Sequence, residues 1–230
     1  MSLIFNNIDK MSFDDLGDES EFIPLMTSED EEALEKENLP EVLPILPLTN
    51  TVLFPGVVIP INAGRDKSIK LINDANKSNK LIGVVSQIDI KVENPSIEDI
   101  YGVGTVAKIL RVLKMPDGNN TVIIQGKKRF KIESVVKTDP YIQATVNSLP
   151  DKNQKKSNNK FTATIDAIRD IALKIIKENP NIPSEASFAI KNIHSSAFLI
   201  NFVCSNMNIS VKDKQDLLSS LNIENRALKC

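Results

Sequence analysis

Four prolines and two glycines interrupt the apolar stretch from residue 43 to residue 72, which reads LPILPLTNTVLFPGVVIPINAGRDKSIKLI. Proline cannot donate a hydrogen bond to a sheet ladder, so it is confined to strand starts, strand edges and bulges. The apolar residues between the prolines therefore predict short strand segments. After Gly64, the spacing of Ile69, Ile72 and Ala75 changes to that of an amphipathic helix, so we expect one helix to begin there.

The chain continues to residue 150 mainly as predicted strands. These strands cover, in order, 81–85, 103–115, 121–125, 129–136 and 141–149. Met115-Pro116-Asp117-Gly118-Asn119 has the proline and glycine of a turn, so 103–125 is expected to form a hairpin. Six or so strands with one early helix predict a small barrel that is closed or partly closed.

A polar run without apolar residues, PDKNQKKSNNK, predicts a linker over 151–160. The linker divides a β-rich part, 40–150, from a helical part, 161–230. We therefore assign the chain to the α+β class, with a mostly-β barrel followed by a bundle of helices.

The helical part shows apolar residues at helical spacing and several helix caps. The first stripe runs from Phe161 to Ile176, and Asn179-Pro180 ends it because the residue before proline disfavours helix. The nearly apolar run 197–204 predicts a buried helix. The expected caps are Ser184, Ser210 and Asn222. The helix that Ser184 caps is expected to carry Phe188. The helix that Ser210 caps is expected to turn Leu217, Leu218 and Leu221 inward.

Charge is distributed unevenly, although the formal net charge is only −2. Residues 1–39 contain twelve acidic and two basic residues, and this composition predicts a disordered acidic tail. The basic residues of the remainder are scattered, apart from Lys127-Lys128-Arg129 beside Phe130. We interpret that cluster as a solvated hairpin end, and the chain gives no indication of a nucleic-acid site.

The glycines do not indicate a nucleotide site. Gly102, Gly104 and Ala107 match a loose dinucleotide pattern, but the residues around them resemble a strand. A pyrophosphate needs the N-terminus of a helix at that point. No phosphate-binding loop ending in Gly-Lys-Ser/Thr occurs, so we expect no cofactor in this chain.

Other reactive side chains also fail to form a recognisable site. The one histidine, His194, precedes two serines without a nucleophile elbow, and we interpret it as a helix-end residue. Cys204 lies in an apolar stretch as a small core residue, and Cys230 is the last residue. Neither has the spacing of a zinc ligand. The acidic residues of the 86–101 connection are interpreted as solvated; they are Asp89, Glu93, Glu98 and Asp99.

The bulk properties are those expected of a cytoplasmic protein without a membrane span. No apolar run approaches the length needed to cross a bilayer, and the N-terminus lacks the pattern of a secretory signal. Two cysteines in a long chain are typical of a reducing compartment.

Three blocks of the sequence resemble the N-terminal domain of Lon-type ATP-dependent proteases. They are LPILPLTNTVLFPGVVIPINAGRDKSI at 43–69, VGTVAKIL at 103–110 and LKMPDG at 113–118. The blocks occur in the family's order, and the resemblance covers about residues 40–228. It implies a PUA-like pseudo-barrel followed by a helical subdomain. It also implies that the last helix, which the sequence cuts at Cys230, leads toward an ATPase module.

The resemblance also implies a function. The region would recognise unfolded or misfolded polypeptide and support assembly of a hexameric serine protease that degrades misfolded and regulatory proteins. Its ATPase module, with ATP and Mg²⁺, and its Ser–Lys protease module would lie beyond residue 230, so no enzymatic activity is expected here. The rival hypothesis is a stand-alone Lon-domain adaptor or small-ligand-binding protein with no protease attached.

The candidate polypeptide contacts lie at two turns bounded by proline. They are Phe54 and Pro55 in the first stretch, and Met115 and Pro116 at the hairpin tip. Apolar side chains at such turns can remain at the surface and meet the apolar segments that folded proteins hide. The alternative, that Phe54 belongs to the core and Met115 is only turn-adjacent, stays open on the sequence.

Overall fold

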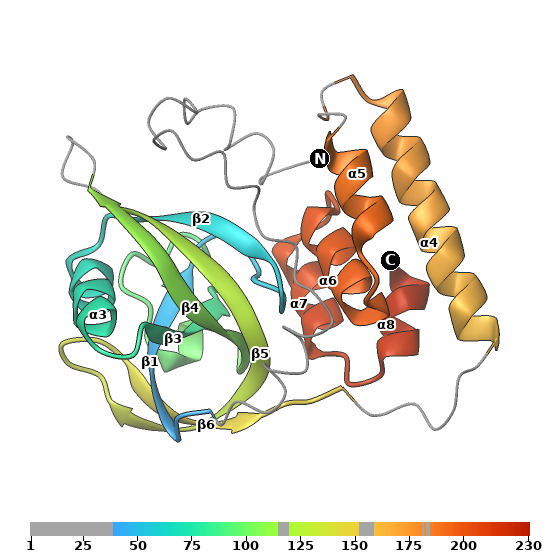
Figure 1. Cartoon of the computed structure of the whole chain (residues 1–230). Helices are drawn as coiled ribbons and strands as arrows, with labels where there is room; N and C mark the ends of the chain where they lie inside the picture. The colour runs from blue at the N-terminus through green and yellow to red at the C-terminus, as the bar shows by residue number, and fades with distance from the viewer. Residues whose placement is uncertain (1–38, 115–119, 152–158, 181, 183–184) are drawn as a thin grey trace.

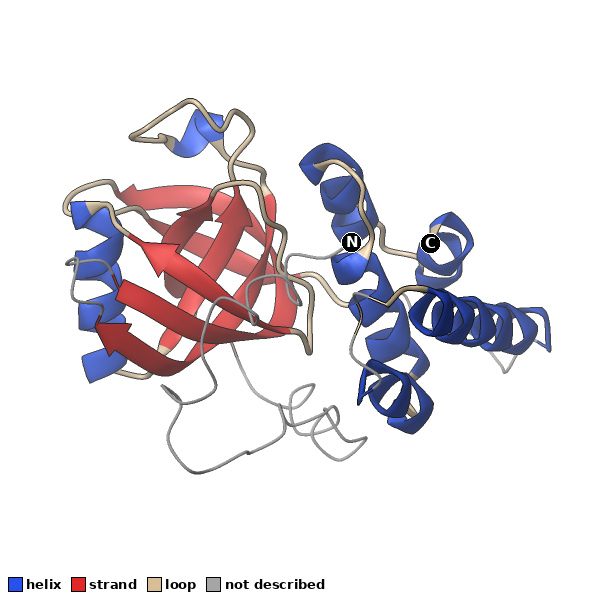
Figure 2. Ribbon diagram, turned by 90° about the horizontal axis from the view of Figure 1, so that it is seen from above, coloured by secondary structure: helices blue, strands red, loops and turns tan. Residues whose placement is uncertain are grey.

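The computed structural model describes residues 39–114, 120–151, 159–180, 182 and 185–230. Within these residues, the strands gather in one body and a group of five helices lies beside it (Figure 1, Figure 2). The strands precede that group in the chain, so the α+β class predicted from the sequence is confirmed. The predicted tail and the hairpin tip at Met115 and Pro116 lie outside the described residues.

The described strands form a sheet that closes on itself. They are β1 (Val42–Leu48), β2 (Val58–Ala63), β3 (Leu81–Ser86), β4 (Val103–Lys114), β5 (Asn120–Lys137) and β6 (Gln143–Ser148). Their order is β2-β5-β4-β3-β1-β6, and β5 also pairs with β6. β1 and β3 are parallel, and the other pairs are antiparallel. The additional β5–β6 pairing confirms the predicted barrel.

β5 is one strand of 18 residues, although the sequence predicted two separate strands here. Its first part pairs with β2, and its last part, from Phe130 onward, pairs with β6. Gly126 lies between the two parts, where a Cβ would come within 2.3 Å of the Phe54 carbonyl oxygen. The predicted break at residues 126–128 is wrong because glycine lets the strand pass the Phe54 turn without ending.

One helix, α3 (Asp66–Lys77), packs against β1 and β3 of the barrel. Leu71, Ile72 and Ala75 are its buried residues, and Ile69 is partly buried. The predicted helical spacing is therefore confirmed. A short 3-10 turn, η2 (Ile97–Asp99), interrupts the connection from β3 to β4.

Five helices follow the barrel in the described chain. They are α4 (Asn159–Glu178), α5 (Glu185–Asn192), α6 (Ser196–Asn206), α7 (Val211–Ser219) and α8 (Ile223–Lys229). Ser210 accepts a hydrogen bond from the Asp213 backbone, and Asn222 accepts from Glu224 and Asn225, which confirms these two predicted caps. The third predicted cap, Ser184, lies outside the described residues.

Most helix residues predicted to face inward are buried or partly buried, but Ile171 and Ile175 of α4 are 59% and 42% exposed. Phe198 and Cys204 of α6 are buried, as expected. Phe188 lies on α5, as predicted, and is 63% exposed because α5 turns Ala186 and Ile190 inward. Leu221 is also exposed, because it lies in the connection after α7 has ended.

Arg129 joins the barrel to the helices and is 4% exposed, so its interpretation as part of a solvated hairpin end is wrong. Its guanidinium donates to the Leu218 and Ser220 carbonyls at 2.6 and 2.7 Å, and to the Asp151 carboxylate at 2.7 Å. Arg226 of α8 is fully buried and donates to the same carboxylate oxygen at 2.5 Å. Burial and the neighbouring Arg226 lower the pKa of Arg129 to about 10, and Asp151 opposes that effect.

A single apolar cluster extends from the barrel interior into the helical part. It includes Phe54 of the barrel and Phe198 and Leu217 of the helices. Two hydrogen bonds cross the same junction: Gln215 donates to the Val103 carbonyl at 2.8 Å, and Asn201 donates to the Pro55 carbonyl at 3.3 Å. Apolar burial therefore holds the barrel and the helical part together, and these two hydrogen bonds fix their relative position.

Candidate functional site

The structure corrects the expectation that the Phe54–Pro55 turn presents a contact surface. Phe54 is 0% exposed and belongs to the core. Pro55 lies beneath α6, where its carbonyl accepts the hydrogen bond from Asn201. The prediction of an exposed Phe54 is wrong because the turn faces the helical part, which sequence periodicity cannot place. Met115 and Pro116 remain untested, since they fall outside the described residues.

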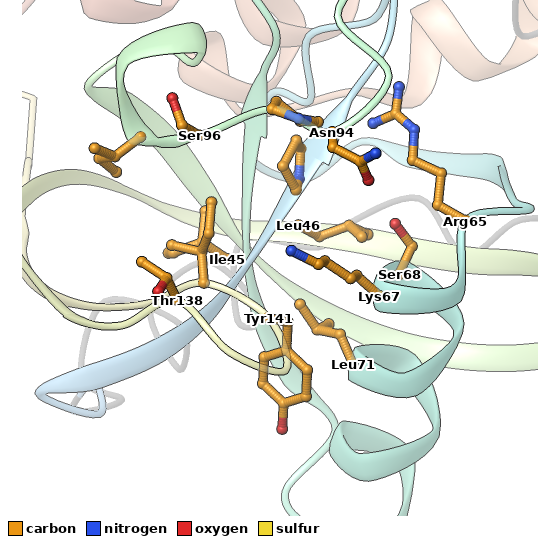
Figure 3. Close-up of a pocket in the computed structure, with 14 residues that line it drawn as sticks. Ile45, Leu46, Arg65, Lys67, Ser68, Leu71, Asn94, Ser96, Thr138 and Tyr141 are labelled. Carbon is orange, nitrogen blue, oxygen red and sulfur yellow. The ribbon is translucent and has the colours of Figure 1, made fainter.

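A pocket of about 250 Å³ opens beside α3 instead (Figure 3). It lies between β1, the start of α3, the loop around η2 and the connection from β5 to β6. Its buried lining is apolar, whereas its outer lining is polar or charged. The apolar lining includes Ile45, Leu46, Leu71 and Ile142, and the outer lining includes Arg65, Lys67, Ser68, Asn94 and Ser96.

Gln87 holds two walls of this pocket together. The residue is buried, directly after β3, and its side-chain oxygen accepts from both terminal nitrogens of Arg65 at 3.2 Å. Its amide nitrogen donates to the Asp89 and Val92 carbonyls at 2.9 and 2.6 Å. One amide therefore ties the residue before α3 to the loop that forms the opposite wall.

Two of the four carboxylates in that loop have structural partners. Asp99 accepts hydrogen bonds from the backbone and hydroxyl of Ser96 at 2.8 and 2.7 Å, which forms a capping box around η2. These hydrogen bonds lower the pKa of Asp99. Asp89 accepts from the Lys91 backbone at 2.9 Å. Both groups thus shape the loop, and the interpretation that the loop carboxylates form no catalytic pair remains our expectation.

The charge at the pocket is positive. Figure 3 shows the Lys67 side chain reaching from α3 across the apolar lining, with its ammonium group among Leu46, Ile45 and Tyr141. None of the fourteen described residues that line the pocket is acidic. Across the described ranges we find no hydrogen bond or ion pair to the Lys67 ammonium. The pocket therefore combines apolar surface with an available positive charge.

Tyr141 forms the wall of the pocket opposite the loop. Its hydroxyl donates to the Asp74 carboxylate at 3.2 Å, which links the β5–β6 connection to α3. Partial burial, followed by the charge of Asp74, raises the pKa of Tyr141. The tyrosine therefore stays neutral at physiological pH and serves as a fixed apolar and aromatic surface.

The described residues show no arrangement typical of catalysis or metal binding. Gly104 and Ala107 lie inside β4, so the helix N-terminus that a pyrophosphate requires does not follow them. Ser195 caps α6 by accepting from the Phe198 backbone at 3.0 Å, and no group of metal-ligating side chains occurs among the residues described. None of the described helices is long and apolar enough to cross a membrane.

Sequence reasoning did not identify the pocket residues Arg65, Lys67 and Tyr141, nor Gln87, which ties two of the pocket walls together. They come from segments far apart in the chain, and only the closure of the barrel brings them together. The one signal available was Gln87, an amide that directly follows the apolar run of β3. A polar residue at the buried end of a strand needs hydrogen-bond partners, and here those partners define the site.

Comparison with known protein families gives a match over nearly all of the described chain. The family model of the ATP-dependent protease La (LON) substrate-binding domain matches residues 42–230. The chain is 61% identical over 222 residues to a Lon protease from Flavobacterium johnsoniae, which covers 96% of this chain and 27% of the relative. A Lon protease from Cytophaga hutchinsonii is 52% identical over 198 residues, covering 86% and 24%. The chain thus spans about a quarter of the length of these relatives.

Solved structures show the same fold. The N-terminal domain of Mycobacterium avium complex Lon protease superposes with a TM-score of 0.65 at 18% identity, covering 81% of this chain and 94% of that one. A Lon N-terminal domain protein from Xanthomonas campestris gives a TM-score of 0.59 at 15% identity, covering 82% and 95%. At these identities the comparison bears on the fold alone.

Proposed function

This chain belongs to the family of Lon protease substrate-binding domains, and we propose that it binds unfolded polypeptide through the pocket beside α3. The observation that carries the proposal is an open pocket beside α3 whose inner lining is apolar. Ile88 and Ile90 precede the residues of the loop around η2 that line the pocket, and they are 54% and 58% exposed. Unfolded chains display the apolar side chains that such a surface can cover, whereas folded proteins hide them.

A single pocket of this size holds about one apolar side chain. Burying a leucine-sized side chain contributes about 1.5–3 kcal/mol, and the loss of freedom on association offsets much of that gain. One subunit should therefore bind weakly. In the proposed hexamer, several pockets would engage one polypeptide and raise its effective concentration at the others. Weak individual sites also suit a protein that must accept many different sequences.

The positive charge at the pocket favours particular polypeptides. Lys67 and Arg65 lie beside the apolar lining without an acidic neighbour in that lining. Segments that place an acidic residue next to an apolar one should therefore bind better than segments with a basic residue there. This preference should decrease as salt is added, because Lys67 is exposed and its interactions are screened.

In the proposed full-length protease, this region selects the polypeptide, and modules elsewhere in the chain perform the chemistry. ATP and Mg²⁺ would bind in the ATPase module, and a Ser–Lys dyad would cleave the substrate. The present chain should then hydrolyse neither ATP nor peptide bonds. ATP turnover by the pure chain, abolished by a substitution within it, would overturn this part of the proposal.

The rival function, a stand-alone small-ligand-binding protein, is less well supported by the pocket. Pockets for drug-sized ligands usually enclose about 300–1,000 Å³. The volume here, about 250 Å³, suits one side chain better than a cofactor or metabolite of ordinary size. The relatives are also proteases about four times as long as the matched region, which favours a role in proteolysis.

Titrating a labelled, permanently unfolded polypeptide into the chain tests the proposal. We expect weak, saturable, ATP-independent binding that Lys67→Glu and Ile90→Asp each reduce several-fold. Both side chains are exposed, so neither substitution should change the melting temperature appreciably.

Two control variants locate the contact. Lys70→Glu makes the same charge change on α3 but lies outside the pocket lining, so it should bind like the unmodified chain. Phe188→Asp removes an exposed aromatic ring from the helical part, far from the pocket residues in sequence. If Phe188→Asp abolishes binding while Lys67→Glu and Ile90→Asp leave it intact, the pocket is not the contact site. If the unmodified chain does not bind at high concentration, recognition of polypeptide by this region is refuted.

A further inference from the structure

The two cysteines of the chain meet at the contact between α6 and α8. Asn201 of α6 accepts a hydrogen bond from Arg226 of α8 at 2.9 Å, and this contact sets the register of the two helices. Cys204 lies about one helical turn beyond Asn201, and Cys230 lies about one turn beyond Arg226. Residues three and four apart share one face of a helix, so Cys204 lies on the face of α6 that Asn201 turns toward α8, and Cys230 lies on the face of α8 that Arg226 turns toward α6.

The local packing confirms this placement. Cys204 is fully buried in the apolar cluster, and Cys230 is half-buried against the same cluster. Each thiol shifts the pKa of the other, and neither forms a disulfide. The Cys230 backbone donates to the Arg226 and Ala227 carbonyls at 3.2 and 3.3 Å, so the last turn of α8 fixes its position.

The charged groups around the pair favour a thiolate at Cys230. The charge of Arg226 acts on the pKa of both thiols, and Lys214, which donates to the Ser205 carbonyl at 2.6 Å, interacts electrostatically with Cys204. The contact with Cys204, together with Arg226, lowers the pKa of Cys230, although partial burial opposes the shift. The contact with Cys230 and burial raise the pKa of Cys204. The accessible sulfur is thus also the more readily ionised of the two.

We propose that Cys204 and Cys230 are an oxidative modification site that forms an intrachain disulfide when the protein meets a hydroperoxide. The Cys230 thiolate attacks the outer oxygen of the peroxide, the O–O bond breaks, and an alcohol or water leaves with one proton from solvent. The resulting sulfenic acid at Cys230 is attacked by the sulfur of Cys204, which loses its proton as the S–O bond breaks and water leaves. The peroxide is reduced by two electrons, and the two thiols supply them.

A disulfide at this place would close a ring that contains the whole of α7. That segment includes the Leu218 and Ser220 carbonyls, which accept hydrogen bonds from Arg129 of the barrel. Cross-linking restricts the unfolded chain, and a ring of this length typically raises the melting temperature of a domain this size by roughly 5–10 °C. Oxidation would therefore strengthen the part of the helical bundle that supports the junction with the barrel.

Treating the full 230-residue chain with hydrogen peroxide and reading the intact mass tests the proposal. We expect both free thiols to disappear, no disulfide to form between chains and the mass of the chain to fall by two hydrogen atoms. The melting temperature should rise and return to its starting value after reduction with dithiothreitol. Peptide mapping without reduction should join the segments that contain Cys204 and Cys230.

Two variants provide the comparison. Cys204→Ser leaves Cys230 without its partner, so peroxide should add oxygen to Cys230 or link two chains, with no rise in melting temperature. Cys230→Ser leaves only the buried thiol, which should react much more slowly. The proposal is refuted if the unmodified chain gains oxygen at Cys230 while Cys204 stays reduced, or if it forms only intermolecular dimers. Those results concern the unmodified protein, so they stand even if a variant fails to fold.

Discussion

Replacing Asp151 by asparagine removes the one negative charge that Arg129 and Arg226 share. The two guanidinium groups are almost completely buried, and both donate to the same oxygen of Asp151, whose side chain is 32% exposed. Removing one partner of a fully buried pair typically costs about 3–5 kcal/mol, because a buried charge is left without compensation. Water partly screens Asp151, so we expect Asp151→Asn to lower the free energy of unfolding by roughly 2–3 kcal/mol.

Urea unfolding of two variants separates the contribution of the Asp151 charge to the free energy of unfolding from the contribution of its hydrogen bonds. Asparagine keeps an oxygen that can accept from both arginines, whereas Asp151→Ala removes the acceptor as well and should cost about 1 kcal/mol more. Asp170→Asn, on the exposed face of α4, is the matched control and should change stability by less than about 0.5 kcal/mol. If Asp151→Asn behaves like this control, the arginines do not depend on Asp151 and the described junction is not held by charge.

The remaining predictions concern the core, a helix cap and the loop at the pocket. Phe198→Ala, at a buried site of α6, should lower the unfolding free energy by about 3–5 kcal/mol, and a loss below about 1 kcal/mol in urea unfolding would mean that the side chain is not packed as described. Ser210→Ala removes the cap of α7 and should cost about 1 kcal/mol in the same assay, whereas no loss would show that α7 does not need it. Because the folded pKa of Asp99 lies below its ordinary value, its stabilisation of η2 is present above that value and is lost as the pH falls through the folded pKa. The amide protection factor around Ser96, taken relative to the intrinsic exchange rate at each pH, should therefore fall on acidification, and an Asp99→Asn variant that keeps the same pH dependence would contradict this assignment.

Local sequence rules predicted the elements of this fold well. The spacing of Ile69, Ile72 and Ala75 located α3, and the apolar run 197–204 located the buried α6. Ser210 and Asn222 cap their helices as expected. These features depend on residues a few positions apart, for which helical periodicity and capping are sufficient.

Contacts between distant segments were the ones that sequence reasoning missed. Arg129 appeared to be a solvated residue, but the carbonyls and carboxylate that bind it lie 22 to 91 residues away. Phe54 appeared to be an exposed turn residue because nothing nearby shows that α6 covers it. The pocket was missed for the same reason, since its four walls are adjacent only in the closed barrel. The family resemblance predicted the fold class but did not place any of these side chains.

The most direct test of polypeptide binding at the pocket is an amide-exchange footprint of the chain with and without a saturating unfolded polypeptide. We expect slower exchange at 65–71, 87–97 and 138–142, the segments that form and support the pocket, and unchanged exchange over α4 and α5. A footprint confined to the helices, or no footprint despite measurable binding, would contradict the assignment of the pocket as the polypeptide contact.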